Sequence, residues 1–206
     1  MKNVEPFILP EAFTRLNLAQ ACGALNDNMV KLLLVFYLVN RAGHEQAGTI
    51  AAIGSGLFIL PFLLFSALAG SLADRLAKQR IIVAVKCVEI GIVILAVAGV
   101  ALDNHTIIYA VVFLLGSHSA LFTPAKYGVV PELVARDQLS RANSLLEMAT
   151  YLGIVGGTAL APILLYLSGS RYTFAVSAGI VVALAGLVFA RALPVTPVAD
   201  AVRPLA

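Results

Sequence analysis

Gly70-Ser-Leu-Ala-Asp-Arg-Leu-Ala-Lys-Gln-Arg80 lies between two long apolar runs of the chain. Three cations and one carboxylate fall within its last seven residues, and such a group cannot lie in hydrocarbon. The stretch therefore predicts a tight hairpin at a membrane surface. We expect Gly70 to let two helices approach closely and Asp74 to cap the helix that follows. The cations that would hold the hairpin on the cytoplasmic side are Arg75, Lys78 and Arg80.

The composition around this hairpin is that of an integral membrane protein. Apolar residues make up 60% of the 206 residues and charged residues 12%, whereas about 25% of the residues of soluble proteins are charged. A membrane-spanning helix needs about 20 residues, and the alternating pattern of outer-membrane barrel strands is absent from the sequence. We therefore predict an all-α membrane protein with six transmembrane helices. Their expected positions are residues 13–40, 47–72, 81–102, 106–123, the region around the uncharged run 148–170, and 172–193.

The distribution of lysine and arginine predicts how these helices are oriented. With a cytoplasmic amino terminus, the outer loops hold two cations, Arg41 and Arg171. The inner loops and ends hold Lys2, Arg15, Arg75, Lys78, Arg80, Lys126, Arg136, Arg141, Arg191 and Arg203. This bias follows the positive-inside rule and explains the net charge of +3 without a nucleic-acid partner. The expected parts are a cytoplasmic segment over residues 1–12, a six-helix domain over 13–193, and a cytoplasmic tail or linker over 194–206.

Residues 1–15 do not resemble a cleaved signal peptide, because they contain acidic residues and prolines. The first helix is therefore expected to stay in the mature protein. We also expect the small residues Gly157 and Ala161, four positions apart, to form a flat surface for close helix crossing.

Charged side chains inside two of the predicted spans are the strongest functional signal. Asp27 and Lys31 lie one helical turn apart in the first span, where each can partly neutralise the other. Lys86 and Glu89 lie three residues apart in the third span. A charge at the centre of a bilayer costs at least about 2.5–3.5 kcal/mol, so these groups should face the bundle interior or a wet cavity. The pattern leaves open whether they join helices together or line a route for a charged solute.

Other reactive residue types do not form a recognisable site in the sequence. It contains no nucleophile–base grouping, no metal-ligand spacing and no phosphate-binding glycine loop, so we predict neither catalysis nor a metal nor a cofactor. Cys22 and Cys87 fall inside predicted spans and are interpreted as small apolar fillers. His118 lies among small polar residues and is interpreted as a hydrogen-bonded packing residue rather than a proton relay.

Two motifs resemble those of known transporters. The hairpin pattern Gly-x-x-x-Asp-Arg-x-x-Lys-x-Arg resembles the loop between the second and third helices of the major facilitator superfamily, although Ala77 stands where that family usually has glycine. The second motif is Pro124-Ala-Lys-Tyr-Gly128 followed by Ala142-Asn143-x-x-x-Glu147. Together with Asp27-Asn28, it resembles the bacterial lysophospholipid transporters, a branch of that superfamily sometimes fused to acyltransferase and acyl-carrier-protein synthetase domains. The resemblance covers about residues 20–165.

The resemblance implies a transporter of the bacterial inner membrane that works by alternating access. Such proteins contain two related six-helix halves that rock around a site near the bilayer midplane. This chain would supply the amino-terminal half and would need a second half or a second copy of itself. The implied partners are membrane lipids, the lysophospholipid, and acyltransferase or acyl-carrier-protein synthetase enzymes.

The residue types also suit a lysophospholipid headgroup, with its phosphate and frequent ammonium group. Lys31, Lys86 and Lys126 would bind the phosphate, and Asp27, Glu89 and Glu147 the ammonium. The implied substrate-binding residues are Asp27, Asn28, Lys31, Lys86, Glu89, Lys126, Asn143 and Glu147. Two other functions fit the sequence. One is a proton-coupled permease for a small polar or drug-like solute, with Asp27 or Glu147 as the titrating group, and the other is a non-transporting membrane anchor or scaffold for acyltransferase enzymes.

Overall fold

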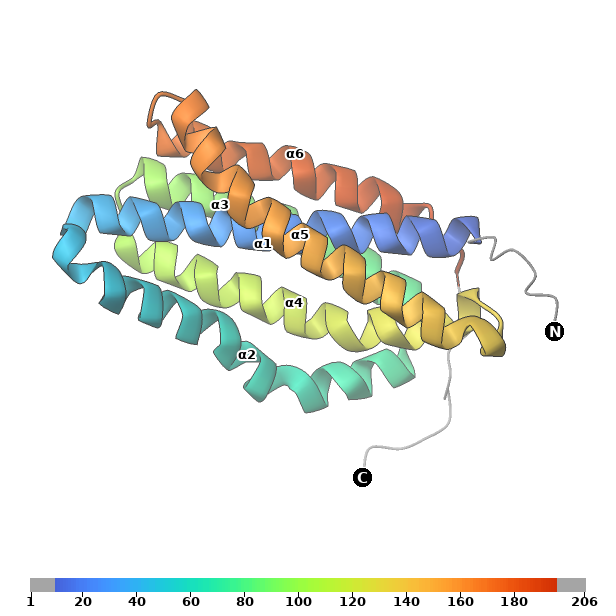
Figure 1. The fold of residues 1–206 in the computed structure, drawn as a ribbon. Coiled ribbons are helices and arrows are strands. Elements are labelled where there is room, and N and C mark those ends of the chain that lie inside the picture. The colour runs from blue at the N-terminus through green and yellow to red at the C-terminus, as the bar shows by residue number, and fades with distance from the viewer. Residues whose placement is uncertain (1–9, 196–206) are drawn as a thin grey trace.

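The computed structural model describes residues 10–195, which form six long α-helices and two short 3-10 turns (Figure 1). Each long helix is apolar enough to cross a membrane, so the predicted all-α fold with six spans is confirmed. Residues 1–9 and 196–206 of the two predicted flanking segments lie outside the described residues. The helices are α1 (Glu11–Ala42), α2 (Ala47–Arg75), α3 (Lys78–Ala101), α4 (His105–Leu133), α5 (Leu139–Leu167) and α6 (Tyr172–Arg191), and the turns are η1 (His44–Gln46) and η2 (Arg136–Gln138).

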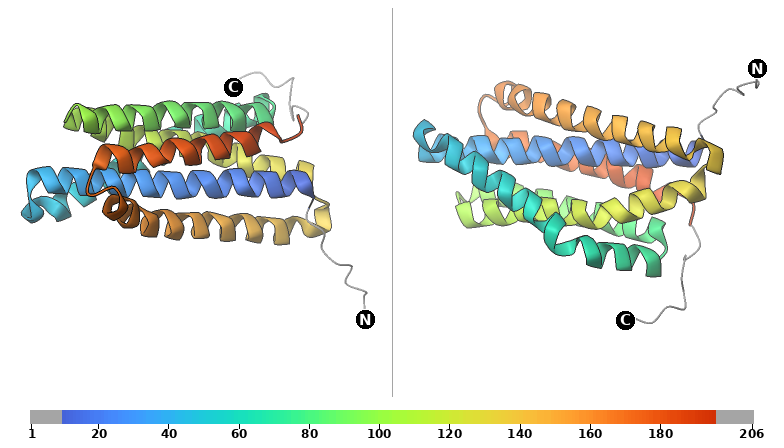
Figure 2. Two further views of the ribbon diagram at one scale, coloured as in Figure 1. Left: turned by 90° about the horizontal axis from the view of Figure 1, so that it is seen from above. Right: turned by 60° about the horizontal axis from the view of Figure 1, so that its bottom comes forward.

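Helix α1 runs through the middle of the bundle. It packs against α5 and α6, while α2 packs against α4, and α3 packs against both α4 and α6 (Figure 2). The start of α1 and the end of α6 lie together, since Nη1 of Arg15 donates a hydrogen bond to the carbonyl oxygen of Ala192 at 2.6 Å. The α2–α3 and α4–α5 turns lie at this same end of the bundle (Figure 1). The bundle therefore has one end rich in cations and one end that carries Arg41 and Arg171.

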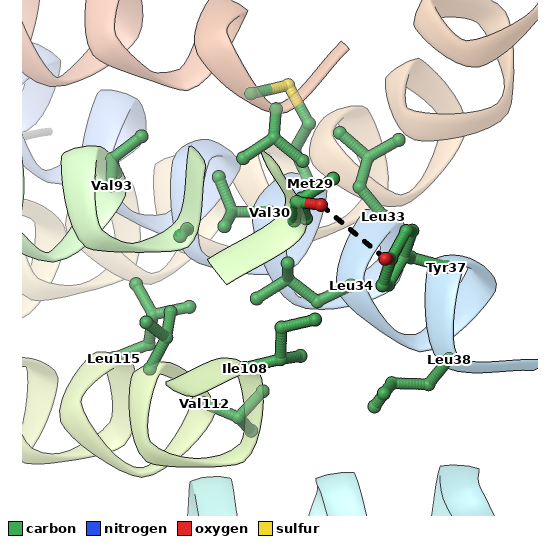
Figure 3. Close-up of a cluster of buried hydrophobic side chains, with 14 of the residues drawn as sticks. Met29, Val30, Leu33, Leu34, Tyr37, Leu38, Val93, Ile108, Val112 and Leu115 are labelled. Carbon is green, nitrogen blue, oxygen red and sulfur yellow. Dashed lines mark hydrogen bonds between the residues drawn. The ribbon is translucent and has the colours of Figure 1, made fainter. Parts of the chain in front are cut away.

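Two buried apolar clusters occupy opposite ends of the bundle. The first joins Leu33 and Leu34 of α1 to Val93 of α3 and Leu115 of α4 (Figure 3). The second, at the cation-rich end, is built from residues such as Phe13, Leu16, Ile82, Val129 and Leu146. A layer of buried polar residues lies between the two clusters along α1, α3 and α4. Its members include Gln20, Asn26, Asp27, Lys86, Glu89 and His118.

Several helix boundaries differ from those predicted, and two of the differences bear on the sequence motifs. Helix α4 was expected to end before Pro124, but it continues through Pro124 and Pro131 to Leu133. Proline is tolerated inside a membrane helix because neighbouring groups can satisfy the backbone carbonyls that it leaves unpaired. Helix α3 begins at Lys78 rather than at residue 81. Because of this early start, most of the charged hairpin is helical and only residues 76–77 separate α2 from α3.

Two details predicted for the hairpin are wrong. Residue Asp74 does not cap α3, because the N-cap position is Ala77 and no side chain makes a capping hydrogen bond there. Asp74 instead lies exposed in the last turn of α2, three residues before the N-cap position of α3. Gly70 does not sit at a close helix contact, since a methyl group added to it would meet no atom within 4 Å.

Small residues bring α5 directly against the backbone of α1. A Cβ atom at Gly153 would lie 2.8 Å from the carbonyl oxygen of Ala21, and one at Gly157 would overlap the carbonyl group of Leu25. Ala161, one turn further along α5, is fully buried. The predicted flat crossing surface at Gly157 and Ala161 is therefore present.

The crossing predicts different effects for two neighbouring substitutions. Gly157→Ala should destabilise the protein by about 1–3 kcal/mol because the added methyl group forces α1 and α5 apart. Gly156→Ala is the matched control, because its added Cβ would only meet Leu25 Cδ1 at 3.7 Å, an ordinary contact. Thermal unfolding of both variants in detergent micelles, followed by circular dichroism, measures the difference. Equal midpoints would show that the close approach at Gly157 does not limit stability.

Candidate functional site

A cavity of about 190 Å³ opens into the polar layer between α1, α2, α3, α4 and α5. Phenyl rings form part of its wall, namely those of Phe58, Phe62 and Phe122. The polar side chains that line it are Gln20, Asp27, Asn28, Lys86, His118, Ser119, Thr123, Lys126 and Thr150. The cavity therefore offers cations, a carboxylate and apolar surface to the same solute.

Lys86 reaches the cavity across a gap left by glycine. Its ammonium group lies where a Cβ atom of Gly23 on α1 would be, so any larger residue at position 23 would displace it. On the other side, a Cβ at Gly186 of α6 would come within 3.5 Å of the same ammonium nitrogen. Glycines on two helices thus make room for a charged side chain from a third.

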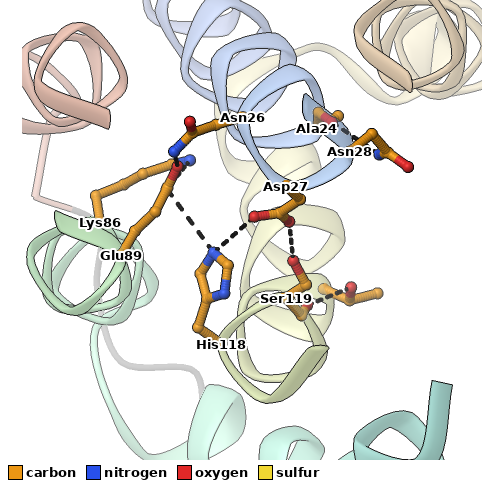
Figure 4. Close-up of polar contacts among 9 residues, drawn as sticks. Ala24, Asn26, Asp27, Asn28, Lys86, Glu89, His118 and Ser119 are labelled. Atoms are coloured by element: carbon orange, nitrogen blue, oxygen red, sulfur yellow. Dashed lines mark hydrogen bonds and ion pairs between the residues drawn. The ribbon is translucent and has the colours of Figure 1, made fainter. Parts of the chain in front are cut away.

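The buried charges form one connected cluster (Figure 4). Nζ of Lys86 lies 2.7 Å from Oε2 of Glu89, and Nδ2 of Asn26 donates to Oε1 of Glu89 at 2.7 Å. Nε2 of His118 lies 3.4 Å from Oδ1 of Asp27 and 3.8 Å from Oε2 of Glu89. The hydroxyl of Ser119 donates a hydrogen bond to Oδ2 of Asp27. Helices α1, α3 and α4 are therefore joined at mid-depth by ionic and polar contacts.

The cluster is a poor site for a metal ion. One ligand atom each from Asp27, Glu89 and His118 lie within 4.8 Å of one another. The ammonium of Lys86, however, is already 2.7 Å from the carboxylate of Glu89. A positive charge in that position repels a second cation, and Glu89 is already paired with it.

Lys126 differs from the other buried lysines because no carboxylate of the described residues forms a direct ion pair with it, and Glu147 attracts it only from more than 4 Å away. It is 5% exposed and lines the cavity, yet within residues 10–195 it makes no hydrogen bond and has no carboxylate oxygen within 4 Å. Its ammonium lies 4.7 Å from the centre of the Tyr127 ring. By contrast, Lys78 is bound to Glu132 at 2.7 Å. Lys126 is therefore the cation best placed to bind an anion that enters the cavity.

The structure divides the eight predicted substrate-binding residues into two groups. The residues that line the cavity are Asp27, Asn28, Lys86 and Lys126, and those that do not are Lys31, Glu89, Asn143 and Glu147. Glu89 is completely buried behind Lys86, which it holds in place. Asn143 is exposed on α5, and Glu147 accepts a hydrogen bond from the hydroxyl of Tyr127.

Asp27 and Lys31 attract each other, as predicted, but only at a distance, and they form no ion pair within 4 Å in the described residues. Asp27 faces α4, where Ser119 and His118 contact its carboxylate. Nζ of Lys31 instead donates to Oδ1 of Asn28 at 3.3 Å and lies 4.4 Å from the centre of the Phe58 ring. The predicted pair of Lys86 and Glu89, in contrast, is present.

The hairpin connects to the second sequence motif through Lys78. The side chain of Lys78 is buried and packs over Gly128, where an added Cβ would lie 2.9 Å from Lys78 Cε. Its ammonium then binds Glu132. Arg75 is half-buried, and Asp74 and Arg80 are exposed. The glycine that ends Pro124-Ala-Lys-Tyr-Gly128 therefore has a packing reason that the sequence did not reveal.

His118 is the main residue whose place was misjudged from sequence. It was interpreted as a hydrogen-bonded packing residue, but it lies between two carboxylates, and its Nδ1 has no hydrogen-bond partner among the described residues. Gln20, which donates to the hydroxyl of Thr150 at 2.9 Å, was also missed. The available signal was the polar run Gly116-Ser-His-Ser119 inside an apolar span.

Comparison with known proteins agrees with this architecture. The family model described as Major Facilitator Superfamily matches residues 16–205. The chain belongs to the major facilitator superfamily. Within the superfamily, the lysophospholipid transporter LplT of Salmonella heidelberg (strain SL476) is 30% identical over 147 residues, which are 71% of this chain and 34% of that protein. LplT of Salmonella schwarzengrund (strain CVM19633) is 34% identical over 109 residues, which are 52% of this chain and 26% of that protein. The match thus spans about a third or less of these relatives.

The Lys86–Glu89 pair predicts a strong non-additive effect on stability. Lys86→Met or Glu89→Met alone should cost about 3–5 kcal/mol, because each leaves an uncompensated buried charge. The double variant should lose less than the sum of the two single variants, since both members of the ion pair are removed together and neither is left without its partner. Unfolding of all four proteins in mixed micelles gives the coupling energy. Additive losses would show that the two groups do not stabilise one another.

Proposed function

We propose that this chain is the amino-terminal half of a lysophospholipid transporter of the bacterial inner membrane. The observation that carries the proposal is the buried ammonium of Lys126, which faces the cavity without a carboxylate oxygen within 4 Å in the described part of the chain. The similarity to transporters named for lysophospholipids supports the same substrate class.

The lining of the cavity suits a headgroup that carries both signs of charge. Lys126 would bind the phosphate through charge-assisted hydrogen bonds, and Asn28 belongs to the same lining. Asp27 is the one carboxylate among the lining residues and would bind an ammonium group. The rings of Phe58 and Phe62 on α2 would contact the glycerol and the start of the acyl chain.

The exposed faces of α2 and α5 suit a covering partner. These are the least buried helices, and they present large apolar residues outward, among them Leu63, Leu64 and Leu68 on α2 and Tyr151, Leu152 and Val155 on α5. We propose that a second six-helix half, or a second copy of this chain, covers part of this surface and completes the cavity, so that alternating access is possible. The cation-rich end would face the cytoplasm, where acyltransferase or acyl-carrier-protein synthetase enzymes would use the lipid.

Two substitutions should separate the roles of the two charges. Lys126→Gln should weaken binding of both lysophosphatidylethanolamine and lysophosphatidylglycerol roughly ten- to hundredfold, because it removes the partner of a phosphate common to both. Asp27→Asn should weaken binding of the ethanolamine lipid alone, because the glycerol lipid has no ammonium group. Binding to the purified chain is measured with radiolabelled lipids, and transfer between leaflets is measured in proteoliposomes.

The matched control is Arg136→Gln, which removes an exposed cation in η2 and should change neither lipid. Unchanged binding of both lipids to the Lys126 variant would remove this residue from the site. Proton current with a small solute and no lipid movement would favour the alternative permease. Capture of acyltransferase partners with lipid transfer at background would favour a scaffold.

A further inference from the structure

The buried cluster beside the cavity carries an unbalanced charge. Asp27 and Glu89 contribute two negative charges, and Lys86 contributes one positive charge, when all three are ionised. All three side chains are at least nine-tenths buried. With a neutral His118, the cluster therefore keeps one net negative charge, and an uncompensated charge at this depth is costly.

His118 is placed to balance that charge with a proton. Its Nε2 lies 3.4 Å from the carboxylate of Asp27 and 3.8 Å from that of Glu89, so a positive imidazolium would face both. Imidazole gains and loses a proton between about pH 5 and 8. One oxygen of Asp27 and Nδ1 of His118 are also buried without a hydrogen-bond partner in residues 10–195. Without an added proton or ligand, these two buried polar atoms therefore have no hydrogen-bond partner in the described residues.

The titratable groups that face His118 come from two of the helices around it, and Arg80 of α3 lines a second cavity together with His118. Helix α1 contributes Asp27, and α3 contributes Lys86 and Glu89. Helix α2 lines the cavity with Phe58 and Phe62, which do not titrate, and α5 lines it with Thr150 and Ile154. On α5 the ionisable Glu147 is bound by Tyr127 instead. Lys126 lies two turns further along α4 and is assigned above to the phosphate.

We propose that His118 holds one exchangeable proton, and that this proton leaves when an ammonium headgroup binds beside Asp27. This inference rests on the proposed function. It adds a proton as the second cation that the site binds, besides the lipid ammonium group. Either the proton or the ammonium brings the cluster to zero net charge, whereas both together would leave a buried positive charge. The two are therefore competing ligands, and each lowers the affinity for the other by the same factor.

The exchange is a simple proton transfer. An N–H bond of the imidazolium breaks, the proton passes to water in the cavity that His118 lines, and the lipid ammonium takes over the attraction of Asp27. The phosphate does not enter this balance, because Lys126 neutralises it separately. A lipid that has phosphate but no ammonium should consequently bind without displacing the proton.

Proton release on binding tests the proposal. Near neutral pH, in weakly buffered detergent solution with a pH dye, lysophosphatidylethanolamine should release up to about one proton for each lipid bound. Lysophosphatidylglycerol should release none. His118→Gln should bind the ethanolamine lipid with no release, and its affinity should stay constant from pH 5 to 8, where the unsubstituted chain should lose up to about tenfold for each unit of acidification. His105→Gln, at an exposed histidine in the first turn of α4, is the control and should keep the release.

The outcomes of this experiment distinguish a failure of the proton assignment from a failure of the proposed function. Equal release with both lipids, or full release from His118→Gln, would overturn the assignment of the proton to His118. The comparison of the two lipids needs no variant, so it stands even if His118→Gln fails to fold. Failure of both lipids to bind the unsubstituted chain would instead overturn the proposed function, on which this inference depends.

Discussion

The arrangement of this bundle depends on the neutralisation of charges that hydrocarbon does not solvate. Glu89 is completely buried, and it is stable there because Lys86, Asn26 and His118 surround its two oxygens. These partners come from α1, α3 and α4, so one carboxylate fixes the relative position of three helices. The apolar clusters on either side then pack against a polar layer whose geometry is already set.

Glycine makes this neutralisation sterically possible. Lys86 can point toward α1 because Gly23 leaves space for its ammonium, and Lys78 can lie over α4 because Gly128 leaves space for its stem. In both cases the lysine side chain occupies a space next to a glycine on the neighbouring helix. Any side chain larger than that of glycine would fill this space. The two lysines differ in depth, however. Lys78 ends in an ion pair with Glu132 at the cation-rich end, whereas Lys86 ends at the cavity.

The sequence predicted those features that depend on hydropathy and local spacing. Six apolar runs and a charged hairpin gave the six helices, and a spacing of three residues gave the Lys86–Glu89 pair. Prediction from the sequence failed where the contact partner of a side chain comes from another helix. Asp27 and Lys31 share a face of α1, yet Asp27 binds Ser119 on α4, a residue 92 positions away. His118 and Gly128 were likewise decided by contacts with distant segments, which spacing along one helix does not reveal.

Lys126 is separate from the buried cluster. The cavity therefore holds a cation and a carboxylate, Lys126 and Asp27, on different helices. Lys86 is ion-paired with Glu89, whereas Lys126 lines the same cavity without a carboxylate oxygen within 4 Å in the described residues, and Glu147 attracts it only from further away. Under the proposed function, an ammonium group would meet a cluster with one negative charge in excess, and a phosphate would meet a separate cation. Because Asp27 lies on α1 and Lys126 on α4, a relative movement of these helices would change the affinity for the proposed headgroup as a whole without altering the chemistry of either contact.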